Sequence, residues 1–305
     1  MNRTHWQVAV AGSFLMVSSH VICSQTQKEH QPVTLKREYR DGETLAYHMK
    51  AINEGHLRTV RYEAEATAKV SEGPAGQFVE SVAWTRLIVG GEPLVLTPAS
   101  QEFREGLSLS PEYTLSVPDL SKVQPILIGP IVDLLTFYAD VQLAMRQNDL
   151  LKAGDHVYVK HGVPSSWADG TYTVFGQDSI DFDITLAKVD ATTHEATLLV
   201  RHVPPAKAQI LFPVAWMGAP VGKLPNNWAE VEKSDGKYLA EVGEELFEVT
   251  IKLAMPSGRI ISADMDNPVE VLERDCEDAT LTKCDAPTRY RIHRQISLVE
   301  SKTPE

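Results

Sequence analysis

The stretch GPIVDLLTFYADVQLAMRQN, residues 129–148, decides the fold, because it is the one long helical pattern in the chain. Gly129-Pro130 suits a helix start, and Asn148 can close the helix in a left-handed cap. Apolar residues recur at spacings of three and four, and others widen this face well past one side. A helix that is apolar over most of its circumference is usually buried. We therefore predict one long buried helix over residues 129–148.

Two acids interrupt this helix. Asp133 and Asp140 are seven residues apart and share a face, and their presence argues against a membrane-spanning segment. One interpretation is a pair of carboxylates aimed into a cavity. The other is a narrow wet edge, which the pattern favours because acids are seldom buried.

Strand patterns lie on both sides of the helix. Residues 58–70 alternate between apolar and polar side chains, which is typical of an antiparallel strand with one wet face. Residues 246–255 and 259–265 read as a hairpin, and 78–89, 269–274 and 290–299 as further strands. Residues 94–96 and 112–117 are shorter strand candidates. We expect a mainly β (α+β) protein.

The two halves of the chain echo one another. The stretch around Gly42 resembles the stretch around Gly154, and Lys69-Val70 resembles Lys188-Val189. Such self-similarity indicates two related antiparallel β-meanders, forming a curved sheet or open barrel. The expected segments are a first meander over 35–128, the central helix over 129–148, and a second meander over 149–300. The second contains a Pro-rich loop, residues 204–228, and ends in hairpins. This loop is either a covering lid or a mobile loop, or it plugs one open end of the sheet.

The first 24 residues read as a secretory signal. Arg3 gives a positive start, and the apolar run VAVAGSFLMV, residues 8–17, is too short to cross a bilayer. Ile22 stands where a lipidation signal needs a small residue, which argues against a lipid anchor on Cys23. Residues 25–34 are polar and read as a disordered leader. No later stretch reads as a transmembrane segment, so we expect an exported protein, periplasmic or extracellular.

Charge and cysteine usage agree with export. The chain has 29 Lys and Arg against 41 Asp and Glu, a net charge of −12, which argues against nucleic acid and anionic membranes as partners. Cys276 and Cys284 are eight residues apart, and in an oxidising compartment we expect a local disulfide between them. Two free thiols in a solvent loop are the alternative.

Motifs of known chemistry are missing. The chain has no nucleophile elbow, P-loop, dinucleotide fingerprint, HExxH or paired CxxC, so we assign no catalytic residue, no metal ligand and no cofactor. His161, Ser165 and Asp169 lie close together, but triads are assembled by the fold rather than by adjacency in sequence. A hydrolase built on scattered Asp and His groups is kept as an alternative.

A family resemblance rests on residues 42–47, GETLAY. This Gly-Glu-x-Leu-x-Tyr strand resembles the opening of the mature region in uncharacterised secreted β-rich proteins of bacteria. The resemblance covers both meanders, and it implies a curved antiparallel sheet without a known activity. The combination of such sheets with an apolar helix is also similar to periplasmic lipoprotein-carrier folds. In these a half-barrel, with helices across its mouth, holds acyl chains.

These observations predict an exported, non-catalytic protein that binds an apolar ligand or an envelope protein in a cleft between helix and sheet. The residues expected to line the cleft are Leu135, Tyr138, Phe212, Trp216 and Trp228. A structural envelope protein is the third possibility, and the oligomeric state stays open. A carrier predicts a continuous apolar cavity, an enzyme predicts convergent polar groups in a pocket, and a structural protein predicts a filled core together with an exposed apolar patch.

Overall fold

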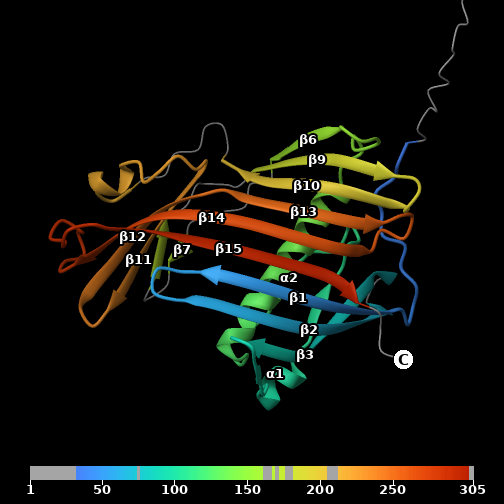
Figure 1. The fold of residues 1–305 in the computed structure, drawn as a ribbon, viewed down its shortest axis with the longest axis horizontal. Helices are drawn as coiled ribbons and strands as arrows, with labels where there is room; N and C mark the ends of the chain where they lie inside the picture. Colours follow the sequence, from blue (N-terminus) through green and yellow to red (C-terminus); the bar gives the residue numbers. More distant parts are fainter. Residues whose placement is uncertain are drawn as a thin grey trace, which may run out of the picture. The chain divides into compact units, whose positions relative to one another are not determined.

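The computed structural model describes residues 32–73, 76–160, 167–168, 172–175, 181–204 and 212–301 (Figure 1). The expected signal at 1–24 lies outside the described residues. So do residues 25–31 of the expected leader, and His161 and Ser165 with Asp169.

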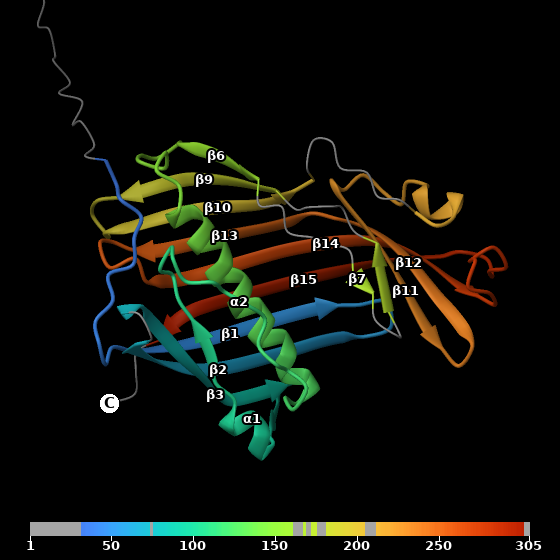
Figure 2. The same ribbon diagram turned by 180° about the vertical axis from the view of Figure 1, so that it is seen from behind.

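The described residues form one large antiparallel sheet that is not closed, crossed by one long helix (Figures 1 and 2). The main path runs β4-β3-β2-β1-β15-β14-β13-β10-β9-β6, β5 pairs with β3, and an arm of β12-β11-β8-β7 pairs with the other part of β14. The predicted mainly β fold class is therefore confirmed. The strands are β1 (Thr44–Glu54), β2 (Thr59–Glu72), β3 (Phe78–Val89), β4 (Glu92–Leu94), β5 (Glu105–Leu107), β6 (His156–Lys160), β7 (Trp167–Ala168), β8 (Tyr172–Phe175), β9 (Asp181–Asp190), β10 (Glu195–Val203), β11 (Asn226–Ser234), β12 (Lys237–Glu245), β13 (Phe247–Ala254), β14 (Ile260–Cys276) and β15 (Thr288–Ser301).

Two related meanders, β1-β2-β3 and β6-β9-β10, begin with the same turn. The amide of Gly42 donates to the carbonyl of Val70 (3.1 Å), and the amide of Gly154 donates to that of Leu186 (2.8 Å). The residue after each glycine accepts in return from the same partner, and both glycines have a positive φ, 75° and 91°. Val70 is therefore equivalent to Leu186. The sequence comparison, which matches Val70 with Val189, is off by three residues.

One face of the sheet is apolar and the other is wet. On β2, Tyr62 and the alanines at 64, 66 and 68 are buried, whereas Glu63 and Glu65 point to the other side. This alternation sets the register, because a slip of one residue would move every apolar side chain to water.

The long helix α2 (Pro125–Met145) begins four residues before the expected start and ends three before the expected end. Pro125 takes the first helical position, and Pro130 lies inside, where it removes one hydrogen-bond donor. At the other end, the amide of Gln147 bonds to the carbonyl of Ala144 (3.0 Å), which tightens the last turn before Asn148.

The helix α2 is a core element. By length and composition alone it could cross a membrane, and it is the one such helix among the described residues. None of its residues from 126 to 145 is exposed. The sheet covers one side, and residues 103–124, called the cover segment from here, lie alongside it (Figure 2).

One expected strand, at residues 112–117, falls in the cover segment. Residues 112–117 form no strand, because side chains of α2 take the backbone acceptors around them. Gln142 Nε2 donates to the carbonyls of Ser108, Ser110 and Tyr113 at 2.8 to 3.1 Å.

The strand β14 joins the two expected strands at 259–265 and 269–274 into one and changes neighbours midway. Up to Asp266 it pairs with β13, and from Val269 it pairs with β12. Pro268 lies at this switch, where its missing amide interrupts the ladder least. A second, smaller apolar cluster packs on the arm around Met217, Ala240 and Cys276.

Residues 32–43, called the N-terminal strap, run past the ends of the strands (Figure 1). Residues 32–34 of the expected leader are thus placed, and the amide of Val33 donates to the carbonyl of Leu151 (2.7 Å). The amide of Glu38 bonds to the carbonyl of Ser257 (2.9 Å). Gly258 allows this approach, because it has a φ of 70° and a Cβ there would overlap the backbone of Lys36.

Candidate functional site

Several buried polar groups lie between α2 and the sheet. Asp133 is buried, and it accepts hydrogen bonds from Tyr62 Oη (2.7 Å) and Arg294 Nη2 (2.8 Å). Burial raises the pKa of this carboxyl, and Arg294 and Tyr62 oppose the rise. The expectation of a wet edge is wrong for Asp133, because partners from β2 and β15 replace water.

Asp140 is also buried, so the wet edge is wrong here too. Its Oδ1 lies 3.2 Å from Nε2 of His202 on β10, whereas Oδ2 has no partner. The His202 ring stacks on Phe247, with centroids 4.1 Å apart, and meets Phe182 edge-on at 4.7 Å. The two acids therefore fasten α2 to different strands instead of converging on one cavity.

A third polar group centres on Glu80 of β3, which is 1% exposed. Tyr138 on α2 donates to Glu80 Oε2 (2.6 Å), and Tyr47 on β1 lies 2.7 Å from the Tyr138 hydroxyl. Burial raises the pKa of Glu80, and the hydrogen bond from Tyr138 and the charge of Arg37 oppose this. Burial also raises the pKa of both tyrosines well above the usual value, so they act as hydrogen-bond donors.

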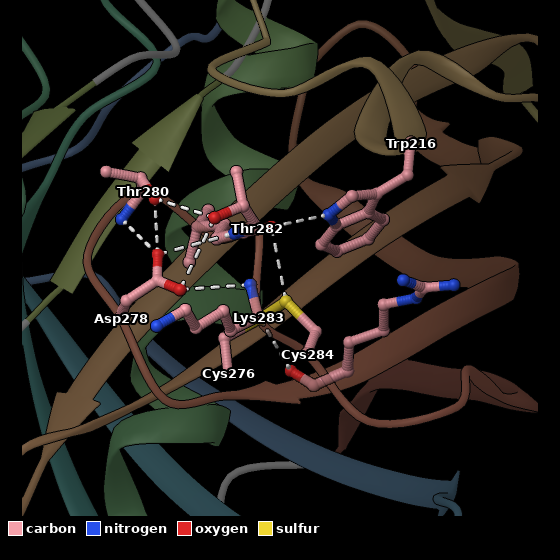
Figure 3. The surroundings of a disulfide bond; sticks show 9 residues. Trp216, Cys276, Asp278, Thr280, Thr282, Lys283 and Cys284 are labelled. Atoms are coloured by element: carbon pink, nitrogen blue, oxygen red, sulfur yellow. Dashed lines mark hydrogen bonds between the residues drawn. A yellow bond between two sulfur atoms is a disulfide. The ribbon is translucent and has the colours of Figure 1, made fainter.

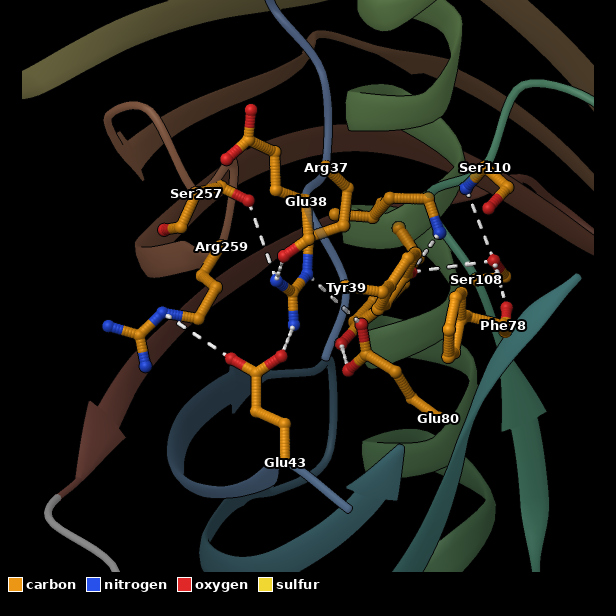
Figure 4. A network of polar contacts seen from close by, with 12 residues as sticks. Arg37, Glu38, Tyr39, Glu43, Phe78, Glu80, Ser108, Ser110, Ser257 and Arg259 are labelled. Atoms are coloured by element: carbon orange, nitrogen blue, oxygen red, sulfur yellow. Dashed lines mark hydrogen bonds and ion pairs between the residues drawn. The ribbon is translucent and has the colours of Figure 1, made fainter. Parts of the chain in front are cut away.

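The Glu80 group extends into the N-terminal strap (Figure 4). The buried Arg37 side chain lies 3.7 Å from Glu80 and donates to Glu43 (2.7 Å), and its guanidinium lies 4.3 Å from the centre of the Tyr39 ring. Tyr39 Oη in turn accepts from the amide of Leu109 (2.7 Å) in the cover segment. One network thus joins strap, sheet, helix and cover.

Glu105 on β5 differs from these acids. It is 1% exposed, and neither of its carboxylate oxygens has a hydrogen-bond partner. Burial raises its pKa to about 8, with no charged neighbour contributing. A carboxyl in this setting stays protonated at neutral pH.

The five residues expected to line a ligand cleft fall in separate places. Leu135 and Tyr138 are both on α2 and belong to the main core, and Tyr138 also donates to Glu80. Phe212 and Trp216 pack on the second cluster. Trp228 lies against Gly243 on the arm, where a Cβ would overlap its ring. The structure thus brings Leu135 together with Tyr138, and Phe212 together with Trp216.

Cys276 and Cys284 are joined in a disulfide, as predicted (Figure 3). The indole of Trp216 donates to the carbonyl of Leu281 (3.0 Å) within the disulfide loop, and Arg274 stacks over the same indole at 5.1 Å. The described part of the Pro-rich loop is therefore fastened to the arm. A loop that is bonded to the arm in this way agrees better with a plug than with a covering lid.

Among the residues that the structure describes, no group of three or more His, Cys, Asp or Glu side chains could hold a metal ion.

No family model matches this chain, and no curated protein matches it either. Among solved structures, an outer membrane protein of Vibrio cholerae, OmpT (in-vitro folded, trimer form), aligns over 86% of this chain and 100% of its own. The identity is 8% and the TM-score is 0.10, so this likeness carries no argument about fold or function.

Proposed function

We propose that the protein is an exported, non-catalytic protein that works by binding a protein partner on the wet face of its sheet. The main support is the packing of α2, in which no residue from 126 to 145 is exposed. A carrier of apolar ligands needs a continuous apolar cavity. The layer between α2 and the sheet instead holds buried core side chains and the buried acids Asp133, Asp140 and Glu80. A filled core instead favours binding through the exterior.

The wet face is hollowed where a partner would sit. A depression of about 570 Å³ crosses β13, β14, β15 and β1, and a second of about 480 Å³ crosses β1, β2 and β3. Both include Lys50 and Ile52, so they adjoin at β1. Ile52 pairs with Arg61 and shares both depressions with Lys50, so it is an apolar residue with polar neighbours. An apolar centre within a polar rim is the usual anatomy of an interface.

The charge of this face is divided. Arg61 lies at the β2 end, whereas Asp264 lies at the β14 end, and neither has an ion pair among the described residues. A partner with the opposite order of charges would be steered onto the face and held in one register.

Export has two further supports. Residues 1–24 have the charged and apolar order of a secretory signal, and Cys276 and Cys284 form a disulfide, which persists in oxidising compartments.

One group favours a hydrolase built on Glu and Tyr side chains rather than on the scattered Asp and His groups expected from the sequence. The Tyr290 hydroxyl donates to Glu241 and lies 3.3 Å from Glu273. Burial raises the pKa of Glu241, the hydrogen bond from Tyr290 opposes this rise, and the charge of Glu273 adds to it. Coupled carboxyls of this kind suit acid–base catalysis. If a panel of chromogenic glycosides and esters reveals activity that Glu241→Gln abolishes, this alternative replaces the binding role.

Site-specific photo-crosslinking tests the proposal. A photoreactive phenylalanine analogue at Ile52 should give a heavier product in the protein's own host. The same analogue at Leu57, which is 89% exposed in the β1–β2 turn, is the control. No product from Ile52, or equal products from both sites, would contradict the proposal. Native mass spectrometry showing a co-purifying lipid would favour a carrier instead.

A further inference from the structure

We infer that the cover segment opens locally from α2 at β5, and that ionisation of Glu105 drives this opening. The inference is independent of the proposed binding role, because it concerns only how α2 becomes accessible.

The attachment of the cover is short. β5 has three residues and pairs with β3 only at Glu80–Leu107, Ser81–Gly106 and Val82–Glu105. Leu107 and Leu109 are 0% and 1% exposed, so apolar burial also holds the segment. Two further hydrogen bonds hold it, from the Ser108 hydroxyl to the carbonyl of Phe78 (2.8 Å) and from the amide of Leu109 to Tyr39 Oη (2.7 Å). Segments held by few bonds and flanked by irregular chain open first in native proteins.

Glu105 opposes this attachment once it ionises. Both carboxylate oxygens are buried without a partner, and Nε1 of Trp84 on β3 is also buried without one. A negative charge on Glu105 would therefore have no hydrogen bond among the described residues to offset it. Charge on Glu105 is tolerated only where water reaches it, which requires β5 to leave β3.

The charged groups on neighbouring elements are engaged elsewhere. On β3, Glu80 is bound to Tyr138 and faces Arg37. On α2, Asp133 is bound to Tyr62 and Arg294, and Asp140 to His202. Beside Glu105 in the chain, Arg104 donates to two backbone carbonyls, and no charged group contributes to the raised pKa of Glu105.

Opening would uncover the outer side of α2. The hydrogen bonds that break are those from Gln142 to three carbonyls, those from Arg146 to the carbonyls of Pro111 and Tyr113, and the one from the amide of Leu109 to Tyr39 in the strap. The carbonyls bound by Gln142 and Arg146 belong to the cover, whereas the partners of Asp133 and Asp140 belong to strands of the sheet. The helix would therefore stay on the sheet while the cover moves.

Hydrogen exchange of the full chain at pH 6 and pH 8 tests the inference. If Glu105 has a pKa of about 8 when covered and 4.5 when open, the opening equilibrium rises about 50-fold between these pH values. The rise should appear at the amides of residues 105–110, after correction for the intrinsic rate. Glu105→Gln should abolish it, and Glu102→Gln, which changes an exposed acid on α1 (Pro98–Glu102), should not.

Three results would overturn the inference: no rise in the wild type, the same rise in Glu105→Gln, or an equal rise in the central strands β14 and β15, which would mean global unfolding. Glu105→Met provides a second test if Glu105→Gln does not fold. It removes the titrating group without adding a polar one, and it too should abolish the rise.

Discussion

Replacing Arg294 with methionine tests whether α2 is held by buried charge. Arg294 donates to Asp133 at 2.8 Å, and the side chains are 35% and 3% exposed. Methionine keeps much of the length but leaves the carboxylate with Tyr62 as its one remaining partner. Breaking a buried pair by removing one member typically costs about 3–5 kcal/mol.

The proton limits this cost. A stranded carboxylate can always be neutralised, so its penalty cannot exceed the free energy of protonating it. From the ordinary pKa of 3.8, this ceiling is about 4 kcal/mol at pH 7 and about 2 kcal/mol at pH 5. The folded-state pKa of Asp133 is raised above 3.8, so ionisation of this carboxyl favours unfolding. The contribution of Asp133 to stability is therefore complete below pH 3.8, and it is lost as the pH rises through the folded-state pKa. The variant should therefore lose about 2–4 kcal/mol at pH 7 and at most about 2 at pH 5.

Urea unfolding followed by tryptophan fluorescence at both pH values measures this. Arg291→Met is the matched control, since Arg291 is 83% exposed and pairs with Glu270 on the surface, where such a pair contributes less than about 1 kcal/mol. Asp133→Asn should be milder than Arg294→Met, because it removes the buried charge itself. A cost for Arg294→Met that equals the control, or that does not change with pH, would refute the reasoning.

Four further changes, one of them with a matched control, have defined outcomes. Asp140→Asn should cost about 1–2 kcal/mol of stability because His202 loses its carboxylate partner. Leu135→Asp should cost more than about 4 kcal/mol because it places a new charge in the main core. Thermal melts in which Asp140→Asn is the more damaging change would contradict both expectations. Replacing both Cys276 and Cys284 with serine should cost about 2–3 kcal/mol of stability and should shift the fluorescence emission of Trp216 to the red. An unchanged emission would mean that the disulfide loop does not hold the indole. Gly258→Ala should destabilise more than Gly236→Ala in a melt, since both glycines have positive φ (70° and 78°) but only Gly258 lies against another backbone; equal losses would show that the strap contact contributes nothing.

Periodicity predicted most of the fold. The alternation in residues 58–70 and the apolar pattern of residues 129–148 identified an antiparallel sheet and one buried helix, because burial imposes periods of two and of three to four. The Gly42 and Gly154 echo identified the two meanders. Helix ends were less accurate, since Pro130 looks like a start and the structure accepts it as an interior residue.

The polar layer under α2 could not be predicted from local pattern. Asp133 and Asp140 are buried because Arg294 and His202 come from strands far along the chain, and no local signal announces such partners. Glu80 and Glu105 did carry a signal, since each occupies an inward position beside apolar neighbours, Val82 and Leu107. An acid in phase with an apolar row marks a buried carboxyl better than acids on a helix do.

The position of β15 determines when the sheet can assemble. β15 is the last strand of the described chain, yet it lies between β1, the first strand, and β14. The contacts that unite the two meanders therefore span nearly the whole described chain, which gives the fold a high contact order. During synthesis β1 keeps an open edge until residues 288–301 emerge, so the halves can form early but cannot join. A chain stopped before residue 288 would therefore carry two unjoined sheet edges, which are the parts of a β protein most prone to pair with other chains.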